Sequence, residues 1–372
     1  LNMRLPDERK GDLYAQIAAI RLGCKRLDEV LTRIGPDVLT QTFSEIVSRT
    51  HHRMQAAISR LPDGQYSFED VMDDDGAGTE NIRIALTIRK KGSRIIFDFN
   101  GTADQVLGNF NQTLNATQSA VCYALKALLD PNVPNNQGIF DAIDIDAPVG
   151  SLVNCVAPAS VALRANTCQR VVDTVIGALA DALPDQVVAA ANGANTSAVF
   201  EGTDPRTGGK YVYFETLGGG MGARAARDGK DGVQVHITNT SNLPVEAIEQ
   251  EYPLRVEEYA LVEDSGGAGQ HRGGMGIRRT IRPINHNCEF NGVGERFTNP
   301  PWGLFGGLPG EPGSFKLKND DGRTTSLPPK ASRVKLTPQD AAIIITPGAG
   351  GYGSPGDRSP EDLDEDKRSG TV

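Results

Sequence analysis

FETLGGGMGARAARDGKDGVQVHITNT, residues 214–240, places four glycines within five positions and follows them with Arg224, Arg227 and Asp228. Glycine has no Cβ, so it permits positive φ angles and close approach to another backbone or to a ligand. Because ordering four glycines costs conformational entropy, we expect the folded protein to use this unusual backbone. Two interpretations follow: a long hairpin loop that needs unusual turns, or a loop that binds an anion or a substrate beside Arg224.

The glycine loop does not match the spacing of common nucleotide-binding motifs. The sequence GGGMGAR lacks the Lys-Ser/Thr pair that ends the motif GxxxxGK[ST]. The pattern GxGxxG fails as well, because a start at Gly218 requires glycine at the position of Ala223. The sequence therefore predicts no nucleotide site in this loop.

The segment after the loop alternates Val233, Val235 and Ile237, which predicts a strand. On such a strand His236 faces away from the apolar side, toward solvent or a site. A single histidine is more often a hydrogen-bonded structural residue than a catalytic one, and both interpretations stay open. The motifs GxSxG and HExxH are absent, so a serine hydrolase of that type and an HExxH metalloprotease have no support.

Composition and charge exclude several classes of protein. The 372 residues are 38% hydrophobic and 23% charged, which is a globular composition of two or three domains by length. The 42 glycines and 22 prolines favour turns and irregular segments over a helical bundle. The formal charge of −9 argues against a nucleic-acid partner. No apolar run approaches the roughly 20 residues that span a membrane, and the polar start gives no secretory signal.

The five cysteines are an odd number, are widely spaced and form no CxxC motif. This pattern argues against a disulfide framework and against a structural zinc site. Each cysteine lies among apolar or small residues, which favours reduced structural thiols and a cytoplasmic protein.

Two helices are predicted at the start of the chain. Apolar residues from Leu13 to Leu31 follow one another at spacings of 4, 3, 4, 3 and 4, and Gly35-Pro36 ends that helix. A second helix is predicted over residues 37–59. The pair would form an antiparallel hairpin or a docking surface, and the adjacent His51 and His52 would be surface residues.

The middle of the chain mixes strands and helices. Alternation over residues 82–88 and 95–99 predicts a hairpin that turns at 90–93. We interpret Asp73-Asp74-Asp75 as a solvated turn, because consecutive carboxylates lack the alternating ligand spacing of a calcium loop. Helices are predicted over residues 115–129 and 164–183, the second with Asn166-Thr167 as its N-cap.

These patterns predict an α+β fold, in which several small mixed sheets carry helices at their edges rather than repeating βαβ units. We expect a helical hairpin over residues 1–60, a mixed α/β domain over 61–200 and a glycine-rich, predominantly β domain over 201–353. Residues 354–372 would form an acidic flexible tail.

Eight blocks of the sequence, in order, resemble one protein family. They include LPDERKGDLYAQIAAIRLGCKRL, FDFNGTADQVLGNFN, the NTCQR of residues 166–170, ETLGGGMGAR, HITNTSNLPVE, YPLRVEEY, SGGAGQHRGGMG and TPGAGGYG. The chain is similar, from about Asn2 to Gly353, to the hydantoinase B/oxoprolinase B family of N-methylhydantoinase B and 5-oxoprolinase-type subunits. Acetone-carboxylase α subunits are more distant members.

The resemblance implies ATP-dependent opening of a cyclic amide such as a hydantoin or 5-oxoproline. A hydantoinase A/oxoprolinase A-type partner would bind ATP and Mg²⁺ and phosphorylate the amide oxygen, and the B subunit would hydrolyse the activated ring within a hetero-oligomer. Family members are normally longer, with an N-terminal portion whose His/Asp-rich motifs look like a divalent-metal site. This sequence has no counterpart of those motifs, so we carry over no metal ligand and expect the metal on that portion.

Within this division of labour, the catalytic candidates are His236 and Arg224, and the substrate-binding candidates are Gly218, Gly219, Gly220, Gly222 and Asn239. Their backbone and side-chain donors would stabilise an oxyanion near the cleft. Two alternatives stay open. The chain could serve a carboxylase that acts on a ketone, or it could be a non-catalytic scaffold that docks an A-type subunit through its two N-terminal helices.

Overall fold

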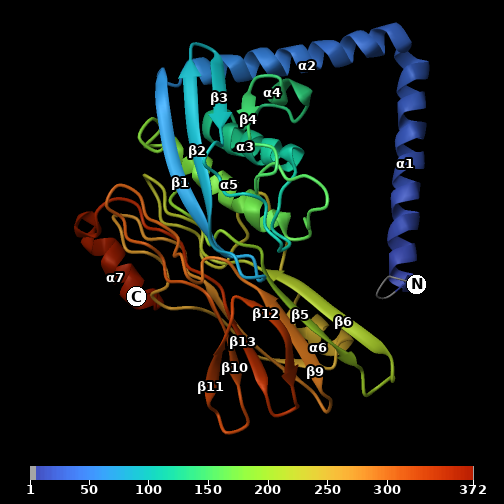
Figure 1. Cartoon of the computed structure of the whole chain (residues 1–372), viewed down its shortest axis with the longest axis vertical. Coiled ribbons are helices and arrows are strands. Elements are labelled where there is room, and N and C mark those ends of the chain that lie inside the picture. Colours follow the sequence, from blue (N-terminus) through green and yellow to red (C-terminus); the bar gives the residue numbers. More distant parts are fainter. Residues whose placement is uncertain (1–5, 372) are drawn as a thin grey trace.

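The computed structural model describes residues 6–371 and confirms the α+β class. Two helices at the start of the chain are followed by three sheets with interspersed helices (Figure 1). Residues 1–5, part of the predicted first segment and of the polar start, lie outside the described residues, as does Val372. No helix within residues 6–371 is long and apolar enough to cross a membrane.

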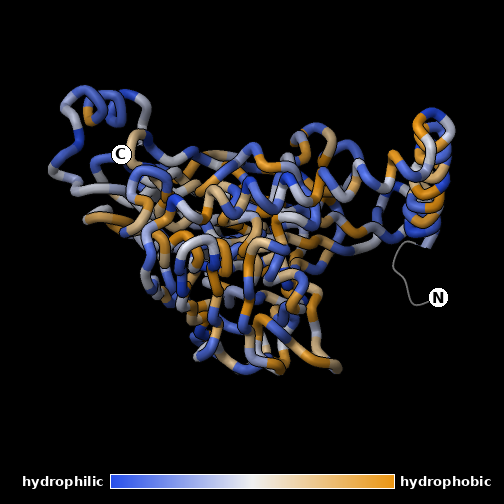
Figure 2. Tube along the Cα trace, turned by 90° about the horizontal axis from the view of Figure 1, so that it is seen from above, coloured by the Kyte–Doolittle hydropathy of each residue, from blue (hydrophilic) through white to orange (hydrophobic). Residues whose placement is uncertain are grey.

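Helices α1 (Pro6–Ile34) and α2 (Pro36–Ser59) meet at a corner instead of folding back on each other (Figure 1). Only Gly35 separates them, with φ at 82°, whereas an antiparallel helical pair needs a loop of about 2–5 residues. The predicted hairpin is therefore wrong in its packing, although both helices exist. Helix α2 has five buried residues, four of them in its C-terminal half (Thr50, Met54, Ala57 and Ile58), but α1 has no buried residue. Figure 2 shows α1 as an arm to one side, with apolar and polar residues interleaved.

The first sheet has the strand order β1-β2-β3-β4. Its strands are β1 (Gly64–Asp74), β2 (Glu80–Lys91), β3 (Arg94–Asp98) and β4 (Asp144–Asp146). Strands β2 and β3 form the predicted hairpin, closed by the pair Lys91 and Arg94. Strand β4 runs parallel to β3, and the connection between them contains α3 (Leu114–Leu129) and α4 (Gln137–Phe140).

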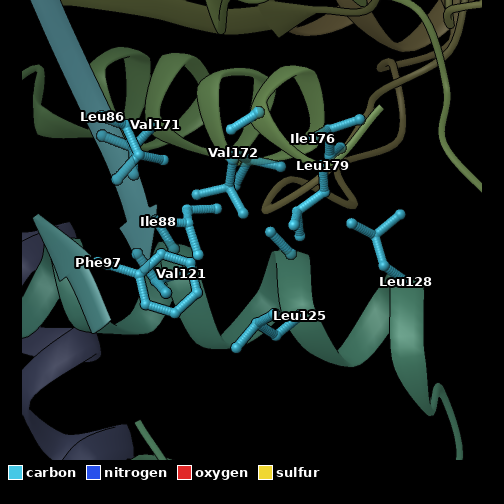
Figure 3. Packing of buried hydrophobic residues seen from close by; sticks show 14 of the residues in the cluster. Leu86, Ile88, Phe97, Val121, Leu125, Leu128, Val171, Val172, Ile176 and Leu179 are labelled. Atoms are coloured by element: carbon cyan, nitrogen blue, oxygen red, sulfur yellow. The ribbon is translucent and has the colours of Figure 1, made fainter. Parts of the chain in front are cut away.

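The main hydrophobic core lies between the first sheet and helices α3 and α5 (Arg164–Ala178). Figure 3 shows apolar side chains of β2 and β3 meeting those of the two helices. The labelled residues are Leu86, Ile88, Phe97, Val121, Leu125, Leu128, Val171, Val172, Ile176 and Leu179. The predicted N-cap of α5 is wrong, because Asn166 and Thr167 lie inside the helix and bond to Asn195 and Phe110 of other segments.

The second half of the chain forms two further sheets. One has the order β12-β9-β5-β6 and the other β11-β10-β13-β8-β7. Their bounds are β5 (Thr196–Thr203), β6 (Lys210–Leu217), β7 (Leu254–Leu261), β8 (Ile277–Pro283), β9 (Cys288–Val293), β10 (Ser314–Lys318), β11 (Thr324–Leu327), β12 (Lys330–Leu336) and β13 (Ala341–Ile345). A second core joins them through Phe200, Phe290 and Phe315, and helix α6 (Val245–Glu251) adds Ile248.

The strand predicted over Val233–Ile237 is wrong. Val233 makes an isolated bridge with Gly219, and the following residues belong to no strand. His236 has a φ of 51°, which is left-handed and breaks the alternation that a strand requires. The segment is therefore a turn that carries His236 toward helix α5.

Glycine-rich segments between the sheets pack directly on one another, and we call this region the glycine bundle. It comprises residues 188–194, 218–232, 265–276, 302–310 and 346–353. Backbone hydrogen bonds link the segments, for example from Gly220 N to Pro347 O at 3.0 Å and from Gly350 N to Ala190 O at 2.9 Å. A Cβ on Gly222 would lie 1.8 Å from Ala189 O. Glycine is needed here because the neighbouring backbone occupies the space of a side chain.

The expected flexible tail is folded in its described part. A 3₁₀ turn (Pro355–Asp357) leads into helix α7 (Pro360–Ser369). The Arg358 guanidinium bridges Asp366 on α7 and Asp228 of the glycine bundle at 2.7 and 2.9 Å. The prediction of a flexible tail was based on acidic composition, but Asp366 of the tail pairs with the largely buried Arg358 side chain, which also ties the tail to Asp228.

Candidate functional site

Helix α5 presents a row of buried polar residues. Asn166, Gln169 and Asp173 follow at spacings of three and four, so they share one face. Each is exposed by 2% or less. Burying a polar group costs free energy unless the group is hydrogen-bonded. This face of α5 is therefore the candidate functional site.

His236 meets this face at Asp173. The distance from His236 Nε2 to Asp173 Oδ1 is 2.9 Å, and the two side chains are exposed by 7% and 1%. Because an ionised carboxylate only accepts hydrogen bonds, Nε2 is the donor and Nδ1 is left as the acceptor of the neutral ring. Nδ1 has no hydrogen-bond partner among the described residues. The arrangement can take a proton at Nδ1 while Asp173 stabilises the resulting cation.

Gln169 fixes the turn that carries His236. Its Nε2 donates to Val235 O and to Thr238 Oγ1, both at 3.0 Å. Thr238 Oγ1 in turn donates to Asn195 Oδ1 at 2.6 Å. The left-handed backbone at His236 is thus held from both sides, which keeps its ring on Asp173.

Tyr123 of α3 packs edge-on against His236, with ring centroids 6.1 Å apart. Burial, together with the nearby charge of Asp173, raises the pKa of the Tyr123 phenol. The hydroxyl therefore stays protonated at neutral pH. Tyr123 also lines a pocket of about 660 Å³ between α3 and α4, with Lys126, Asn135 and Phe140 among its other walls.

A network of buried charges, which we call the charged junction, adjoins Asp173. Arg296 NH2 contacts Asp173 Oδ2 at 2.9 Å and Asp70 Oδ2 at 2.8 Å. Arg170 NH1 contacts Asp70 Oδ1 at 3.1 Å, and Trp302 Nε1 donates to Asp70 Oδ2 at 3.0 Å. Burial alone would raise the pKa of Asp70, but the two arginines and Trp302 outweigh it and lower that pKa to about 2.

The charged junction continues to strand β12. Glu295 accepts from Arg170 NH2 at 3.3 Å and from Lys330 Nζ at 2.6 Å. Asp73 is only 3% exposed and accepts the backbone N–H groups of residues 297–299. The interpretation of Asp73-Asp74-Asp75 as a solvated turn is therefore wrong for Asp73, which fastens the end of β1 to the segment after β9. It is also wrong for Asp75, which is 4% exposed and accepts a hydrogen bond from Gly108 N.

The predicted glycines have a packing role in the glycine bundle. Gly219 N and Gly220 N donate to Val233 O and Pro347 O at 3.0 Å, so neither N–H is free for an oxyanion. Gly222 packs on Ala189. Gly218 and Asn239 line a pocket of about 490 Å³ with Met221, Lys230 and Gln234. Their assignment to substrate binding stays a prediction.

Arg224 and His236 are not joined by any hydrogen bond or ion pair among residues 6–371. Arg224 bridges to Val188 and Arg227 through its backbone, and its Nε is buried without a hydrogen-bond partner in that range. His236 instead belongs with Asp173 and Tyr123. The two catalytic candidates therefore occupy separate surroundings.

The described residues offer no group of three or more His, Cys, Asp or Glu side chains placed to hold a metal ion. All five cysteines are free. Burial raises the pKa of Cys122 and Cys288 to about 12 and, as the largest effect, that of Cys168 to about 11, which agrees with inert thiols. Cys24 differs, since it is exposed on α1.

Sequence reasoning missed Asp173, Gln169, Tyr123 and Arg296. A signal for the first two was present: polar residues recur at spacings of three and four in NTCQRVVD, residues 166–173, on a helix recognised as apolar. Tyr123 and Arg296 give no comparable signal, because only the tertiary fold brings them to α5.

Comparison with known proteins assigns the family. The model described as Hydantoinase B/oxoprolinase matches residues 1–355, and the chain belongs to this family. It is 35% identical over 96% of its length to the uncharacterised protein MJ0963 of Methanocaldococcus jannaschii and 33% identical over 92% to 5-oxoprolinase 1 of Arabidopsis thaliana. It spans 61% and 27% of those proteins.

Two solved structures share the fold. The ATP-dependent caprolactamase from Pseudomonas jessenii aligns with a TM-score of 0.87 and 27% identity, over 100% of this chain and 65% of that one. Nucleotide-free acetone carboxylase aligns with a TM-score of 0.80 over 94% of this chain and 53% of its own. At 17% identity, the second likeness shows the fold alone.

Proposed function

We propose that this chain is a B-type subunit, or part of one, of an ATP-dependent hydrolase that opens cyclic amides such as hydantoin or 5-oxoproline. The observation that carries the proposal is the buried pair of His236 and Asp173 at 2.9 Å in a chain of the Hydantoinase B/oxoprolinase family. An aspartate-oriented histidine is suited to take a proton from a water molecule that attacks an amide carbon.

The proposed chemistry adds water across the ring C–N bond. His236 Nδ1 accepts a proton from the water, and the water oxygen bonds to the amide carbon. The C–N bond breaks, and the ring nitrogen leaves with a proton, as an amine from 5-oxoproline or as a ureido NH2 from hydantoin. The phosphoryl group that the partner placed on the amide oxygen departs as inorganic phosphate, and a carboxylate remains. Tyr123, which packs on His236 and lines the 660 Å³ pocket, supplies a protonated hydroxyl at the pocket wall. We place the ring of the substrate in that pocket.

A partner completes this proposal. An A-type subunit would bind ATP and Mg²⁺ and activate the amide oxygen, and a divalent metal would belong to polypeptide outside this chain. The caprolactamase relative of Pseudomonas jessenii carries the name subunit beta, which supports a hetero-oligomer. The cytoplasmic location expected from cysteine usage stays a prediction.

The test is an assay of the chain assembled with an A-type partner, with hydantoin, 5-oxoproline or caprolactam and ATP. We expect His236→Gln to lower kcat/KM by about 100-fold or more, as general-base loss does, while His52→Gln on exposed α2 has no effect. Arg224→Ala tests the second candidate in the same assay. If both His236→Gln and Arg224→Ala stay within about twofold of the unmodified complex, the catalytic assignment is wrong.

A scaffold role is the alternative, and the exposed apolar side of α1 favours it. In that case the complex would keep its turnover in His236→Gln but lose its partner when α1 is altered. The substrate that is consumed together with ATP distinguishes a cyclic-amide hydrolase from a ketone carboxylase.

A further inference from the structure

We infer that Arg296 is a positioning residue, which sets the orientation and tautomer of His236 through Asp173. Within residues 6–371 no hydrogen bond or ion pair joins Arg296 to His236, and the two side chains contact different oxygens of Asp173. The inference extends the proposed function, and its first test does not depend on that function.

The geometry makes Asp173 a bridge with one oxygen for each partner. Oδ1 faces His236 Nε2 at 2.9 Å, and Oδ2 faces Arg296 NH2 at the same distance. Both carboxylate oxygens are thus committed, so the carboxylate plane cannot rotate without breaking a charge-assisted hydrogen bond. The histidine ring is held because its acceptor is held.

Arg296 is itself fixed from three directions. Its two terminal nitrogens contact Asp70 Oδ1 and Oδ2 at 3.1 and 2.8 Å, which is the bidentate geometry that an arginine fork favours. Its side chain is only 1% exposed and its backbone has a φ of 62°. A non-glycine residue in this left-handed region persists only where the surroundings determine it.

Gly193 closes the third side. Its φ is 58°, and a Cβ there would lie 2.7 Å from Arg296 Nε and 3.3 Å from Asp173 Oδ2. Glycine is therefore the residue that lets the guanidinium stack against the backbone of the 190–195 segment. A methyl group at this position would displace Arg296 while leaving every charge of the junction in place.

If the Arg296–Asp173 ion pair were purely structural, it would hold the packed segments together without determining the orientation or the tautomer of His236. The two roles differ in what a small displacement of Arg296 does. A stabilising contact changes the free energy of unfolding, whereas a positioning contact changes the protonated nitrogen of His236 in the folded protein.

The first experiment is Gly193→Ala in the whole chain, read by ¹⁵N NMR of its histidine rings, with His236 assigned by its loss in His236→Gln. We expect the unmodified protein to carry the His236 proton on Nε2 and Gly193→Ala to populate both tautomers. The matched control is Gly208→Ala, which has a similar φ of 73° but meets nothing within 4 Å, and it should leave the His236 signals unchanged.

Arg296→Lys is a second variant that tests the same role if Gly193→Ala does not fold. Arg296→Lys retains the positive charge, but a single ammonium cannot reproduce the fork that spans Asp70 and Asp173. We expect it too to mix the His236 tautomers. Unchanged His236 signals in folded Gly193→Ala or Arg296→Lys, or equal changes in Gly208→Ala, would overturn the inference.

The kinetic arm separates this inference from the proposed function. In the assembled complex, we expect Gly193→Ala to lower kcat by about 10-fold or more with KM within about threefold. A changed tautomer with unchanged kcat would leave Arg296 as the residue that positions His236 and would contradict a catalytic role of His236. An unchanged tautomer would remove the positioning role, whatever the activity of His236→Gln.

Discussion

Helices α1 and α5 differ in a way that their sequences do not suggest. Helix α1 has a regular apolar stripe, yet none of its 29 residues is buried. Helix α5 carries asparagine, glutamine, arginine and aspartate, yet twelve of its 15 residues are buried. Apolar periodicity tells which face of a helix would be covered, but only a partner element covers it. Polar residues on the covered helix mark the candidate site.

The largest expected difference between the two helices concerns arginine. We expect Arg170→Met on α5 to lower the free energy of unfolding by about 3–5 kcal/mol, because Asp70 and Glu295 each lose a buried partner. The exposed Arg21 of α1 is the control, and Arg21→Met should change the free energy of unfolding by about 0.5 kcal/mol or less. Urea unfolding at pH 7 measures both. A loss below 1 kcal/mol in Arg170→Met would contradict the importance of the charged junction.

A second difference is the response to acid, because the charged junction around α5 contains the buried carboxylate of Asp70, which pairs with Arg170 of α5. The pKa of Asp70 is about 2, below its usual 3.8, so its ionisation stabilises the fold above about pH 4. That stabilisation, about 2 kcal/mol, is lost as the pH falls through 2. The exposed ion pairs of α1, such as Arg9 with Asp12, should contribute little. Urea unfolding at pH 4 and 2.5 checks this, and equal stability at both would contradict it.

The smallest effects compare one glycine from each helix. A Cβ on Gly177 of α5 would lie 2.8 Å from the Phe68 ring, whereas one on Gly23 of α1 meets nothing within 4 Å. We expect Gly177→Ala to destabilise the protein, near the low end of about 1–3 kcal/mol because the half-buried ring can shift. Gly23→Ala should stabilise α1 by up to about 1 kcal/mol. Urea unfolding and helical circular dichroism on heating measure the stability of the two variants. A stability change of the same sign in Gly177→Ala and Gly23→Ala would contradict the prediction.

Local patterns predicted most single elements. The helix at 115–129 and the hairpin of β2 and β3 agree with the predictions within a few residues. The pairing of the strands did not follow from local patterns, since β12 pairs with β9 and β13 pairs with β8 and β10. Strand partners are long-range choices, and alternation within one segment carries no information about them.

One residue of the candidate site, His236, could be predicted from the sequence. His236 could be singled out by its isolation among valines and isoleucine, but its partner Asp173 lies 63 positions earlier on a helix. The glycines next to it looked like a ligand loop, whereas Gly220 and Gly222 pack on Pro347, Ala349 and Ala189. Close backbone approach explains glycine in both cases, and the sequence does not say what approaches.

The sequence by itself determined the α+β class, the family and the helical periodicity of α1 and α5, because these follow from local spacing and from motifs in order. Only the tertiary structure decided which helix is buried, which charges pair and where His236 points. The physical reason is that burial and ion pairing depend on groups far apart in the chain, such as Asp70, Asp173 and Arg296. Folding brings these charges to one place from which water is excluded, and their pairing then determines what the site can do.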